Sequence, residues 1–304
     1  MVEKKLGAWL DGNIIDSDKA TVPILTHSMQ YGSGIFEGIR AYDTGKGVSI
    51  FRLDDHIQRF LNSAKIYSMK LNYGFKELRE ACINLVKSNG LTYGYIRPFA
   101  FYNDARIGVS TEGKAVSVFI AAMPFGDYFG GKHDKGVSCK ISSWQRINSS
   151  ILPVEAKASG NYLNSIIASN EARGVGFDEA ILTSSDGYVA EGPGENIFVV
   201  KDGKLITPGP GADILMGITR DSLIKLAKSS GMEVEERAVH KEELLTADEA
   251  FFSGTAAEIT HIRKVDGAVI NDGLAGPVTK KLAQMYGDAA RGKNEKFGKW
   301  LTFV

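Results

Sequence analysis

The 304-residue sequence predicts an α+β protein in two domains, with a barrel-like second half. Short strands and helices are mixed in the first third of the chain. The second half instead contains many short strands joined by the turn dipeptides Asp186-Gly187, Asp202-Gly203 and Asp266-Gly267. Strict alternation of strands with helices and internal repeats are both missing from the sequence, which argues against a doubly wound sheet or a TIM barrel.

The first domain is expected over residues 1–123. Apolar residues on both sides of Asp11-Gly12 predict a hairpin, and residues 49–51 predict a strand that runs into a helix near Asp54. That helix has an apolar stripe of Ile57, Phe60, Leu61 and Ala64. A second helix, ending at Gly90, has a stripe of Leu78, Cys82, Leu85 and Val86. Residues 95–101 and 116–122 are rich in β-formers and predict strands.

Glycine and charge interrupt the pattern at residues 124–135, which we expect to be an interdomain linker. The second domain is expected over residues 136–304. Two helices interrupt its strands, one from Tyr162 to Arg173 before Gly174, and one over residues 219–230 before a further glycine.

Lysine plus arginine and aspartate plus glutamate both total 36, so the formal net charge is zero. A chain without a basic excess has no electrostatic footprint for nucleic acid or an anionic membrane, and a small-molecule partner is expected. The first residues lack a signal-peptide pattern, and no apolar stretch in the sequence has the length of a membrane span. Cys82 and Cys139 form no metal-ligand spacing, so we expect no metal site and two buried thiols in a reducing cytoplasm.

Two glycine-containing segments have features of phosphate-binding loops. Residues 32–38 look like a dinucleotide loop, but the third glycine has the wrong spacing and the segment lies in no strand–helix–strand unit. In residues 217–221, Thr219 can cap a periodic helix, whose free N–H groups and positive dipole end suit a phosphate. Taken alone, simple capping is the favoured interpretation.

Two other segments carry ionisable groups. Glu191 and Glu195 lie in a Glu-Gly-Pro-Gly-Glu-Asn turn between strands, where a tight loop with two solvated acids is the simplest interpretation. Lys157 precedes a helix, and a lone lysine at such a place is usually a surface group. Neither segment assigns a function by itself.

Together these segments resemble the fold-type IV pyridoxal-phosphate enzymes, and most of all the branched-chain amino acid aminotransferases. The motifs in the second half are Lys157-x-x-Gly160-Asn161-Tyr162, Glu191-Gly-x-Gly-Glu-Asn196, Gly217-Ile-Thr-Arg-Asp221 and Ser253-Gly-Thr-Ala-Ala-Glu258. Those in the first half are Tyr31-Gly32, Phe36-Glu37-Gly38-Ile39-Arg40, His56-Ile57-Gln58-Arg59 and Tyr95-Ile96-Arg97-Pro98. The resemblance covers nearly the whole chain. It implies a smaller N-terminal α/β sandwich-like domain and a larger C-terminal pseudo-barrel domain.

The implied reaction is transamination of leucine, isoleucine and valine with 2-oxoglutarate, giving branched 2-oxo acids and L-glutamate, and the implied cofactor is pyridoxal 5′-phosphate. Lys157 matches the lysine that forms the Schiff base and shuttles a proton during the reaction. Glu191 matches the acid that faces the pyridine nitrogen, and Tyr162 the phenol that bonds the ring oxygen. The phosphate contacts match Arg59, Gly217, Ile218, Thr219 and Thr255. The helical pattern taken alone points the Arg59 side chain into solvent.

On a strand, Tyr95 and Arg97 share one face because side chains repeat every two residues. The resemblance implies that Tyr95 binds the substrate α-carboxylate and that Arg97 meets the side-chain carboxylate of glutamate. The other positions that match substrate contacts are Tyr31, Phe36, Gly38, Arg40, Val109, Phe125, Tyr128, Thr255 and Ala256. Tyr31 and Val109 match positions supplied by a second subunit. A homodimer is therefore implied as the minimal unit, and a higher homo-oligomer such as a hexamer is compatible with it.

The chain departs from the family pattern at three places. Phe125 stands where a tryptophan is common, Met216 stands where proline often occurs, and Ser-Thr-Glu follows Val109 in place of the usual asparagine and prolines. These departures leave the size of the substrate pocket open.

Related activities are the nearest alternatives. D-amino acid aminotransferases typically carry an Arg-x-His pair, whereas this chain has Arg97-Pro98-Phe99. Aminodeoxychorismate lyases share the lysine and the acid but cleave their substrate, and a vitamin carrier or regulator would not need the complete set of reactive groups. The Tyr-x-Arg pair and the full-length agreement favour the aminotransferase.

Overall fold

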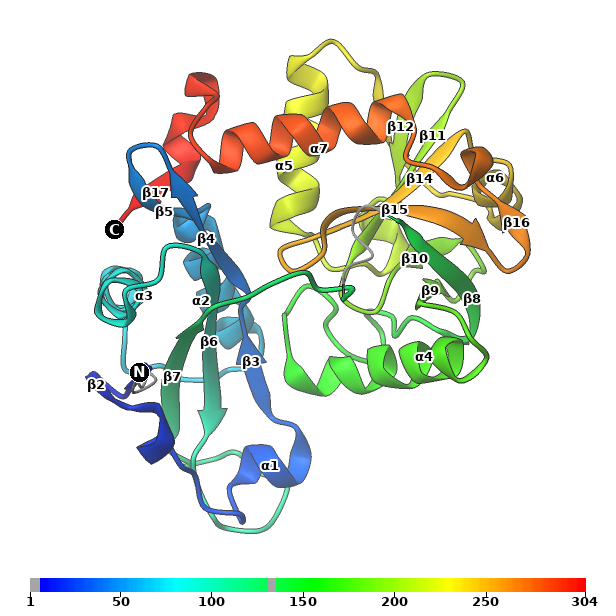
Figure 1. Cartoon of the computed structure of the whole chain (residues 1–304). Helices are drawn as coiled ribbons and strands as arrows, with labels where there is room; N and C mark the ends of the chain where they lie inside the picture. The colour runs from blue at the N-terminus through cyan, green and yellow to red at the C-terminus, as the bar shows by residue number, and fades with distance from the viewer. Residues whose placement is uncertain (1–5, 131–134) are drawn as a thin grey trace. The chain divides into compact units, whose positions relative to one another are not determined.

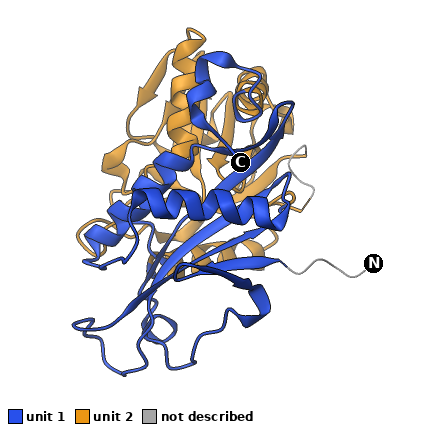
Figure 2. Cartoon of the chain, turned by 90° about the vertical axis from the view of Figure 1, so that its left-hand side faces the viewer, with its two compact units in different colours: residues 1–125, 156–160, 289–304 blue, residues 126–155, 161–288 orange. Residues whose placement is uncertain are grey.

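The computed structural model describes residues 6–130 and 135–304, which divide into two compact units (Figure 2). Unit 1 combines the segments Met1–Phe125, Ala156–Gly160 and Ala289–Val304, and unit 2 combines Gly126–Glu155 and Asn161–Asp288. Residues 131–134 of the expected linker, and residues 1–5, lie outside the described residues. The compact units thus do not follow a single cut through the chain.

Unit 1 is built on an antiparallel sheet in the strand order β17-β5-β4-β6-β7-β1-β2, with β3 paired to β6. Its strands are β1 (Gly7–Leu10), β2 (Asn13–Asp16), β3 (Gly34–Phe36), β4 (Ile39–Thr44), β5 (Gly47–Phe51), β6 (Gly94–Tyr102), β7 (Val116–Met123) and β17 (Leu301–Phe303). Its helices are α1 (His27–Tyr31), α2 (Leu53–Ile66) and α3 (Phe75–Asn89). The hairpin predicted around Asp11-Gly12 and both predicted helices are confirmed.

Helices α2 and α3 form because their apolar residues recur on one face, and that face is buried. Ile57 and Phe60 of α2 are fully buried, and α3 contributes Leu78 and Leu85 to the same core. The two helices pack on each other, α3 lies against β1, β6 and β7, and α2 lies against β3 (Figure 1). Burying a side chain of this size contributes roughly 1.5–3 kcal/mol, so this face holds unit 1 together.

Unit 2 contains a closed six-strand barrel, because β10 pairs with both β9 and β11 at the ends of the order β10-β9-β8-β15-β14-β11. Its strands are β8 (Val137–Gln145), β9 (Glu179–Thr183), β10 (Val189–Glu191), β11 (Asn196–Lys201), β12 (Lys204–Thr207), β13 (Val234–Glu236), β14 (Glu249–Gly254), β15 (Glu258–Val265) and β16 (Ala268–Val269). Its helices are α4 (Tyr162–Gly174), α5 (Ile218–Ser229), α6 (Lys241–Leu245) and most of α7 (Pro277–Ala290). The predicted α+β class and barrel-like second half are confirmed.

The turn dipeptides close hairpins as predicted. Asp202 and Gly203, between β11 and β12, have φ values of 49° and 77°. Both values are positive, as the tight hairpin turn requires, and aspartate and glycine tolerate them better than other residues. Helix α4 lies against β8 and β9 and buries only small side chains, Ser165, Ala168 and Ala172, which lets it approach the barrel closely (Figure 1). Among the described residues, no helix has both the length and the hydropathy to cross a membrane.

Candidate active site

Lys157 lies in a short segment of unit 1 that is tied to two other elements. Its carbonyl accepts a hydrogen bond from the Phe36 N–H at 2.9 Å, and its own N–H donates to Ser63 Oγ on α2 at 3.0 Å. An antiparallel bridge joins the next residue, Ala158, to Ile35 of β3. The Lys157 ammonium nitrogen lies 5.0 Å from the centre of the Phe36 ring. The backbone of this lysine is therefore fixed on both sides, which is atypical of a surface lysine.

Arg59, on α2, is held by a buried carboxylate. Its Nε donates to Glu37 Oε1 at 2.6 Å and its Nη2 donates to Glu37 Oε2 at 2.9 Å. His56 Nδ1 lies 2.7 Å from the same Oε2, and the Gly38 N–H donates to it at 3.2 Å. The Arg59 side chain is 15% exposed, so the solvent-facing orientation indicated by the helical pattern is wrong. The helix turns this face toward β3, and Glu37 follows β3 directly.

The charges in this cluster fix its protonation state. Burial alone would raise the pKa of Glu37, but the charges of Arg59 and His56 and their hydrogen bonds outweigh it and hold that pKa far below its ordinary value of 4.5. Burial lowers the pKa of His56 from its ordinary value of 6.5; Glu37 opposes this shift, and Arg59 and Lys157 add to it. We therefore assign an ionised Glu37 that accepts a hydrogen bond from Nδ1 of a neutral His56.

Six of the residues expected to bind substrate come together in unit 1: Phe36, Gly38, Arg40, Tyr95, Arg97 and Phe125. The Arg97 guanidinium carbon lies 4.7 Å from the centre of the Phe36 ring and 5.3 Å from that of Tyr95. The Tyr95 and Phe125 rings are 4.8 Å apart, and the Arg40 guanidinium carbon lies 5.3 Å from the Phe125 ring centre. A Cβ at Gly38 would collide with the Tyr95 hydroxyl, so only glycine fits there.

Arg97 is the charged side chain that contacts both Phe36 and Tyr95 in this aromatic group. Its Nη2 donates to the Tyr95 hydroxyl at 3.2 Å, which confirms that the two side chains share one face of β6. Its Nε is buried and, among the described residues, has no hydrogen-bond partner. A buried guanidinium N–H without a partner is costly, and a bound carboxylate can satisfy it.

Tyr31 and Val109 lie on the exposed surface of unit 1, 41% and 80% exposed. The Tyr31 hydroxyl accepts a hydrogen bond from the Gly108 N–H at 3.0 Å. His27 Nε2 lies 3.1 Å from the Gly108 carbonyl oxygen, so α1 and the loop around residue 108 form one structural piece. The two residues expected to act on a neighbouring subunit therefore lie on one surface.

In unit 2, Glu191 ends β10 and is buried. Arg146 Nε donates to its Oε1 at 2.7 Å, while Asn196 Nδ2 and the Leu215 N–H donate to its Oε2 at 3.1 and 3.2 Å. Arg146 is itself buried and its Nη1 lies 3.5 Å from Asn164 Oδ1. The expectation of a solvated acid in a loop is wrong for Glu191, because Arg146, Asn196 and the Leu215 N–H all donate to it and hold the carboxylate in place.

The start of α5 is attached to the same carboxylate. Asn196 Nδ2 also donates to the Leu215 carbonyl at 2.8 Å, and a Cβ at Gly217 would collide with Asn196 Oδ1. Helix α5 starts at Ile218 with Gly217 as its N-cap, so the expectation that Thr219 caps the helix is wrong. Thr219 instead lies in the first turn, where backbone N–H groups have no partner within the helix and attract anions.

The other expected residues of unit 2 lie at the ends of elements. Tyr162 is the first residue of α4, and Thr255 and Ala256 form the turn between β14 and β15. Tyr128 lies before β8, and the charge of Glu195, together with burial, raises the pKa of its phenol well above the ordinary value.

These residues fit pyridoxal 5′-phosphate in chemistry. Unit 1 offers an anchored lysine and an oriented arginine, and unit 2 offers a fixed carboxylate, a phenol and the N-terminus of α5. Taken one by one, Glu191 suits a protonated ring nitrogen, Lys157 suits an aldehyde, and Arg59 and the first turn of α5 each suit a phosphate.

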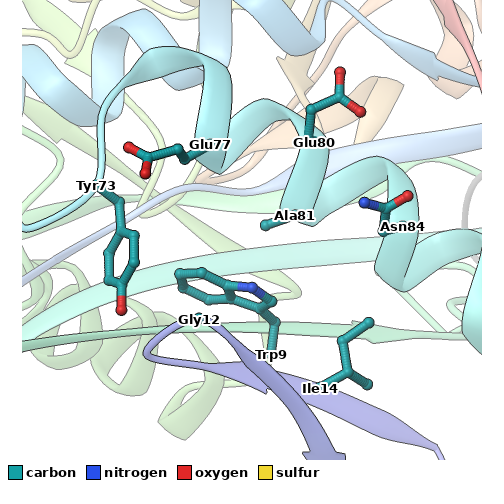
Figure 3. Close-up of a pocket in the computed structure, with 8 residues that line it drawn as sticks. All are labelled: Trp9, Gly12, Ile14, Tyr73, Glu77, Glu80, Ala81 and Asn84. Atoms are coloured by element: carbon teal, nitrogen blue, oxygen red, sulfur yellow. The ribbon is translucent and has the colours of Figure 1, made fainter.

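A surface pocket elsewhere in unit 1 has different chemistry. It has a volume of about 320 Å³ and lies between the first hairpin and α3, where Trp9, Tyr73, Glu77 and Asn84 are among its walls (Figure 3). The Glu77 carboxylate accepts the Gly74 N–H at 2.7 Å and so caps α3. None of the expected site residues lines this pocket.

Comparison with known proteins agrees with the chemistry of these residues. Residues 34–265 match the family model described as amino-transferase class IV. The branched-chain-amino-acid aminotransferase of Salmonella typhimurium is 44% identical, over 97% of this chain and 96% of that protein. The structure of a branched-chain aminotransferase from Thermoproteus uzoniensis with norvaline superposes with a TM-score of 0.94 at 46% identity, covering 98% of this chain and 99% of that one.

A branched-chain amino acid aminotransferase from T.th., complexed with N-(5′-phosphopyridoxyl)-L-glutamate, superposes with a TM-score of 0.94 at 40% identity, covering 99% of each chain. The match extends through the segments that hold Lys157, Arg59, Glu191 and Arg97. The chain belongs to the class IV aminotransferases, and within them to the branched-chain amino acid aminotransferases.

Proposed function

We propose that this enzyme transfers the amino group of leucine, isoleucine or valine to 2-oxoglutarate, with Lys157 as the covalent anchor of pyridoxal 5′-phosphate. The bound cofactor supplies an electron sink for the negative charge that develops at the substrate Cα. Family membership and the cofactor-derived ligand of a 40%-identical relative support this assignment. The roles of individual residues follow from their surroundings in each unit.

Lys157 would remove a proton from the substrate Cα and deliver it to the C4′ carbon of the bound cofactor. This role needs a side-chain amine that can move while the main chain of the lysine stays in place. The hydrogen bonds of the Lys157 N–H and carbonyl provide the fixed backbone, and the flexible side chain over the Phe36 ring provides the reach. Lysine amines act in this way as bases once their proton is lost.

Glu191 holds a proton on the ring nitrogen. Its carboxylate keeps one orientation because Arg146, Asn196 and the Leu215 N–H all donate to it. An anion beside the ring favours the protonated nitrogen, and groups fixed in advance stabilise a transition state without reorganising. When the cofactor is bound, the first turn of α5 and Arg59 would each contact its phosphate, and Tyr162 would donate to the ring oxygen.

The single observation that carries the substrate assignment is the position of Arg97 among aromatic rings. Phe36, Tyr95 and Phe125 offer an apolar surface suited to a branched side chain. The buried Nε of Arg97, unpartnered among the described residues, offers the charge that a glutamate side chain needs. The ligands of the two structural relatives are norvaline, whose side chain is apolar and unbranched, and an adduct of glutamate, whose side chain carries a carboxylate.

We infer a homodimer as the working unit. Ile24, Met29, Ile107 and Val109 are 76%, 62%, 75% and 80% exposed, and all belong to unit 1 around α1 and the loop at residue 108. A monomer rarely exposes this much apolar surface in one region. Light scattering should give at least twice the chain mass, and Val109→Asp should lower it; a monomeric parent protein would refute the dimer.

We also infer a cytoplasmic location. Cys82 and Cys139 are buried free thiols, and burial raises the pKa of the Cys82 thiol to about 12. Such thiols are inert and need no disulfide, as in proteins of a reducing compartment. Detection of the protein in the cytosolic fraction of its cells would test this inference.

A spectral half-reaction tests the function. The visible absorption of the cofactor-loaded protein should fall when L-leucine is added and return when 2-oxoglutarate follows. L-valine and L-isoleucine should act likewise, and D-leucine should not. A response to D-leucine alone would instead indicate a D-amino acid aminotransferase, and no response to either would refute transamination.

A further inference from the structure

Ser63 interrupts the apolar face of α2. The buried residues of this helix include Ile57, Phe60 and Ala64, and Ser63 lies among them without any exposed surface. A serine inside a helix usually faces solvent or bonds the carbonyl four residues earlier. Ser63 Oγ instead accepts the N–H of Lys157, which is 94 residues away in sequence. This hydrogen bond uses the hydroxyl for a tertiary contact.

The hydrogen bond is one half of a clamp on Lys157. The other half is the Phe36 N–H, which donates to the Lys157 carbonyl at 2.9 Å. One side of the lysine therefore depends on α2 and the other on β3. Removal of either hydrogen bond lets the segment 156–160 shift, and the Lys157 Cα atom moves with it.

The same helix carries Arg59, four residues before Ser63. Residues at this spacing lie on one face of a helix. Glu37 fixes the Arg59 guanidinium through two hydrogen bonds, and Glu37 directly follows Phe36 in the chain. Helix α2 and the end of β3 thus fix the position of Lys157 relative to Arg59.

We propose that Ser63 is a positioning residue for Lys157, acting through the lysine backbone and not on the substrate. This inference rests on the proposed function, which makes Lys157 the anchor of the cofactor. Transfer of a proton by an amine depends on its placement, and a displacement near 1 Å can cost about a hundredfold in rate. Ser63 therefore acts on the rates of the lysine's reactions and has no direct effect on the affinity for the amino acid.

The experiment compares Ser63→Ala with Ser49→Ala. Ser49, on β5, is also fully buried in unit 1, and its Oγ has no hydrogen-bond partner among the described residues. The two substitutions remove the same atom from buried sites, but Ser63→Ala alone leaves a backbone N–H without its acceptor. Ser63→Cys serves as a second variant, because it fills the space while sulfur accepts hydrogen bonds poorly.

Three measurements are made on the full chain: the thermal midpoint, the rate at which cofactor-free protein binds added pyridoxal 5′-phosphate, and kcat and KM for L-leucine. We expect Ser63→Ala and Ser63→Cys to slow cofactor capture and lower kcat by about tenfold or more, with KM within about twofold of the parent value. Ser49→Ala should match the parent in all three. If Ser63→Ala fails to fold, the comparison of Ser63→Cys with Ser49→Ala decides.

Parental capture rate and kcat in a folded Ser63 variant would overturn the proposal, as would an equal loss in Ser49→Ala. A rise in KM without a fall in kcat would also overturn it, because the serine would then act on substrate binding. Cofactor capture is measured without any amino acid. A parent protein that captures the cofactor but does not react with L-leucine would therefore refute the proposed function and leave the role of Ser63 standing.

Discussion

Arg146 and Glu191 form a buried ion pair, with Arg146 Nε 2.7 Å from Glu191 Oε1 and each side chain 7% exposed. The two residues are 45 positions apart: Arg146 directly follows β8, and Glu191 ends β10. Charges removed from water destabilise a fold unless they are paired and hydrogen-bonded. Here the carboxylate is paired, and Asn196 and the Leu215 N–H complete its hydrogen bonds. The pair keeps a buried anion in one orientation.

Arg146→Met should therefore lower the free energy of unfolding by about 3 kcal/mol, because it leaves Glu191 buried without its cation. Adding Glu191→Gln should restore part of the loss, and urea unfolding of both variants would measure the coupling. Lys225→Met is the matched control. Its ion pair with Asp221 has a similar length of 2.7 Å but is 50% and 41% exposed, so the change should cost less than about 1 kcal/mol. Equal costs for the buried and the exposed pair would contradict this account.

Arg97→Met should impair the reaction with glutamate far more than that with leucine. A charged hydrogen-bond partner lost from a buried carboxylate costs about 3 kcal/mol, or roughly a hundredfold in rate. Leucine has no side-chain carboxylate and needs no such partner. Single-turnover rates of the colour change with each amino acid would measure the difference.

Arg52→Met is the control for Arg97→Met. The Arg52 guanidinium carbon also lies over an aromatic ring, 5.1 Å from the centre of the Trp300 ring. This variant should treat both amino acids alike. Equal losses with leucine and glutamate in Arg97→Met would mean that Arg97 binds the α-carboxylate that the two substrates share.

The Glu37 cluster predicts loss of stability in acid. The folded pKa of His56 lies below its ordinary 6.5, so the unfolded chain binds more protons and stability starts to fall as the pH drops below about 6.5. The folded pKa of Glu37 lies below its ordinary 4.5, so its contribution is complete above that pH and is lost as the pH falls further. Glu37→Gln should be less stable at pH 7 and should show a weaker pH dependence below 4.5. Unfolding by urea at a series of pH values would measure both; an unchanged acid slope would exclude Glu37 as its source.

The elements of the fold could largely be predicted from local sequence. Periodic apolar residues predicted α2 and α3, and Asp-Gly dipeptides marked hairpins such as that at Asp202-Gly203. Closure of the barrel between β10 and β11 and the joining of residues 156–160 and 289–304 to unit 1 depend on contacts between distant parts of the chain. Local periodicity in the sequence does not predict such contacts.

The candidate site divides in the same way. Motif spacing identified Lys157 and Glu191, but not the groups that hold them, because Ser63 lies 94 residues from Lys157 and Arg146 lies 45 residues from Glu191. One signal was present in the sequence for Ser63, a serine within the apolar stripe of α2. Helical periodicity also pointed Arg59 to solvent, because it cannot include the buried acid that Glu37 supplies 22 residues earlier.

The most direct test of the central claim is to locate the lysine that holds the cofactor. The protein loaded with pyridoxal 5′-phosphate is reduced with borohydride, which makes the link to an amine permanent, and its peptides are then analysed by mass spectrometry. The account predicts one phosphopyridoxyl group, on Lys157, and its absence from the same peptide of Lys157→Ala. Modification of another lysine at full occupancy, or no modification in a protein that still transaminates leucine, would contradict it.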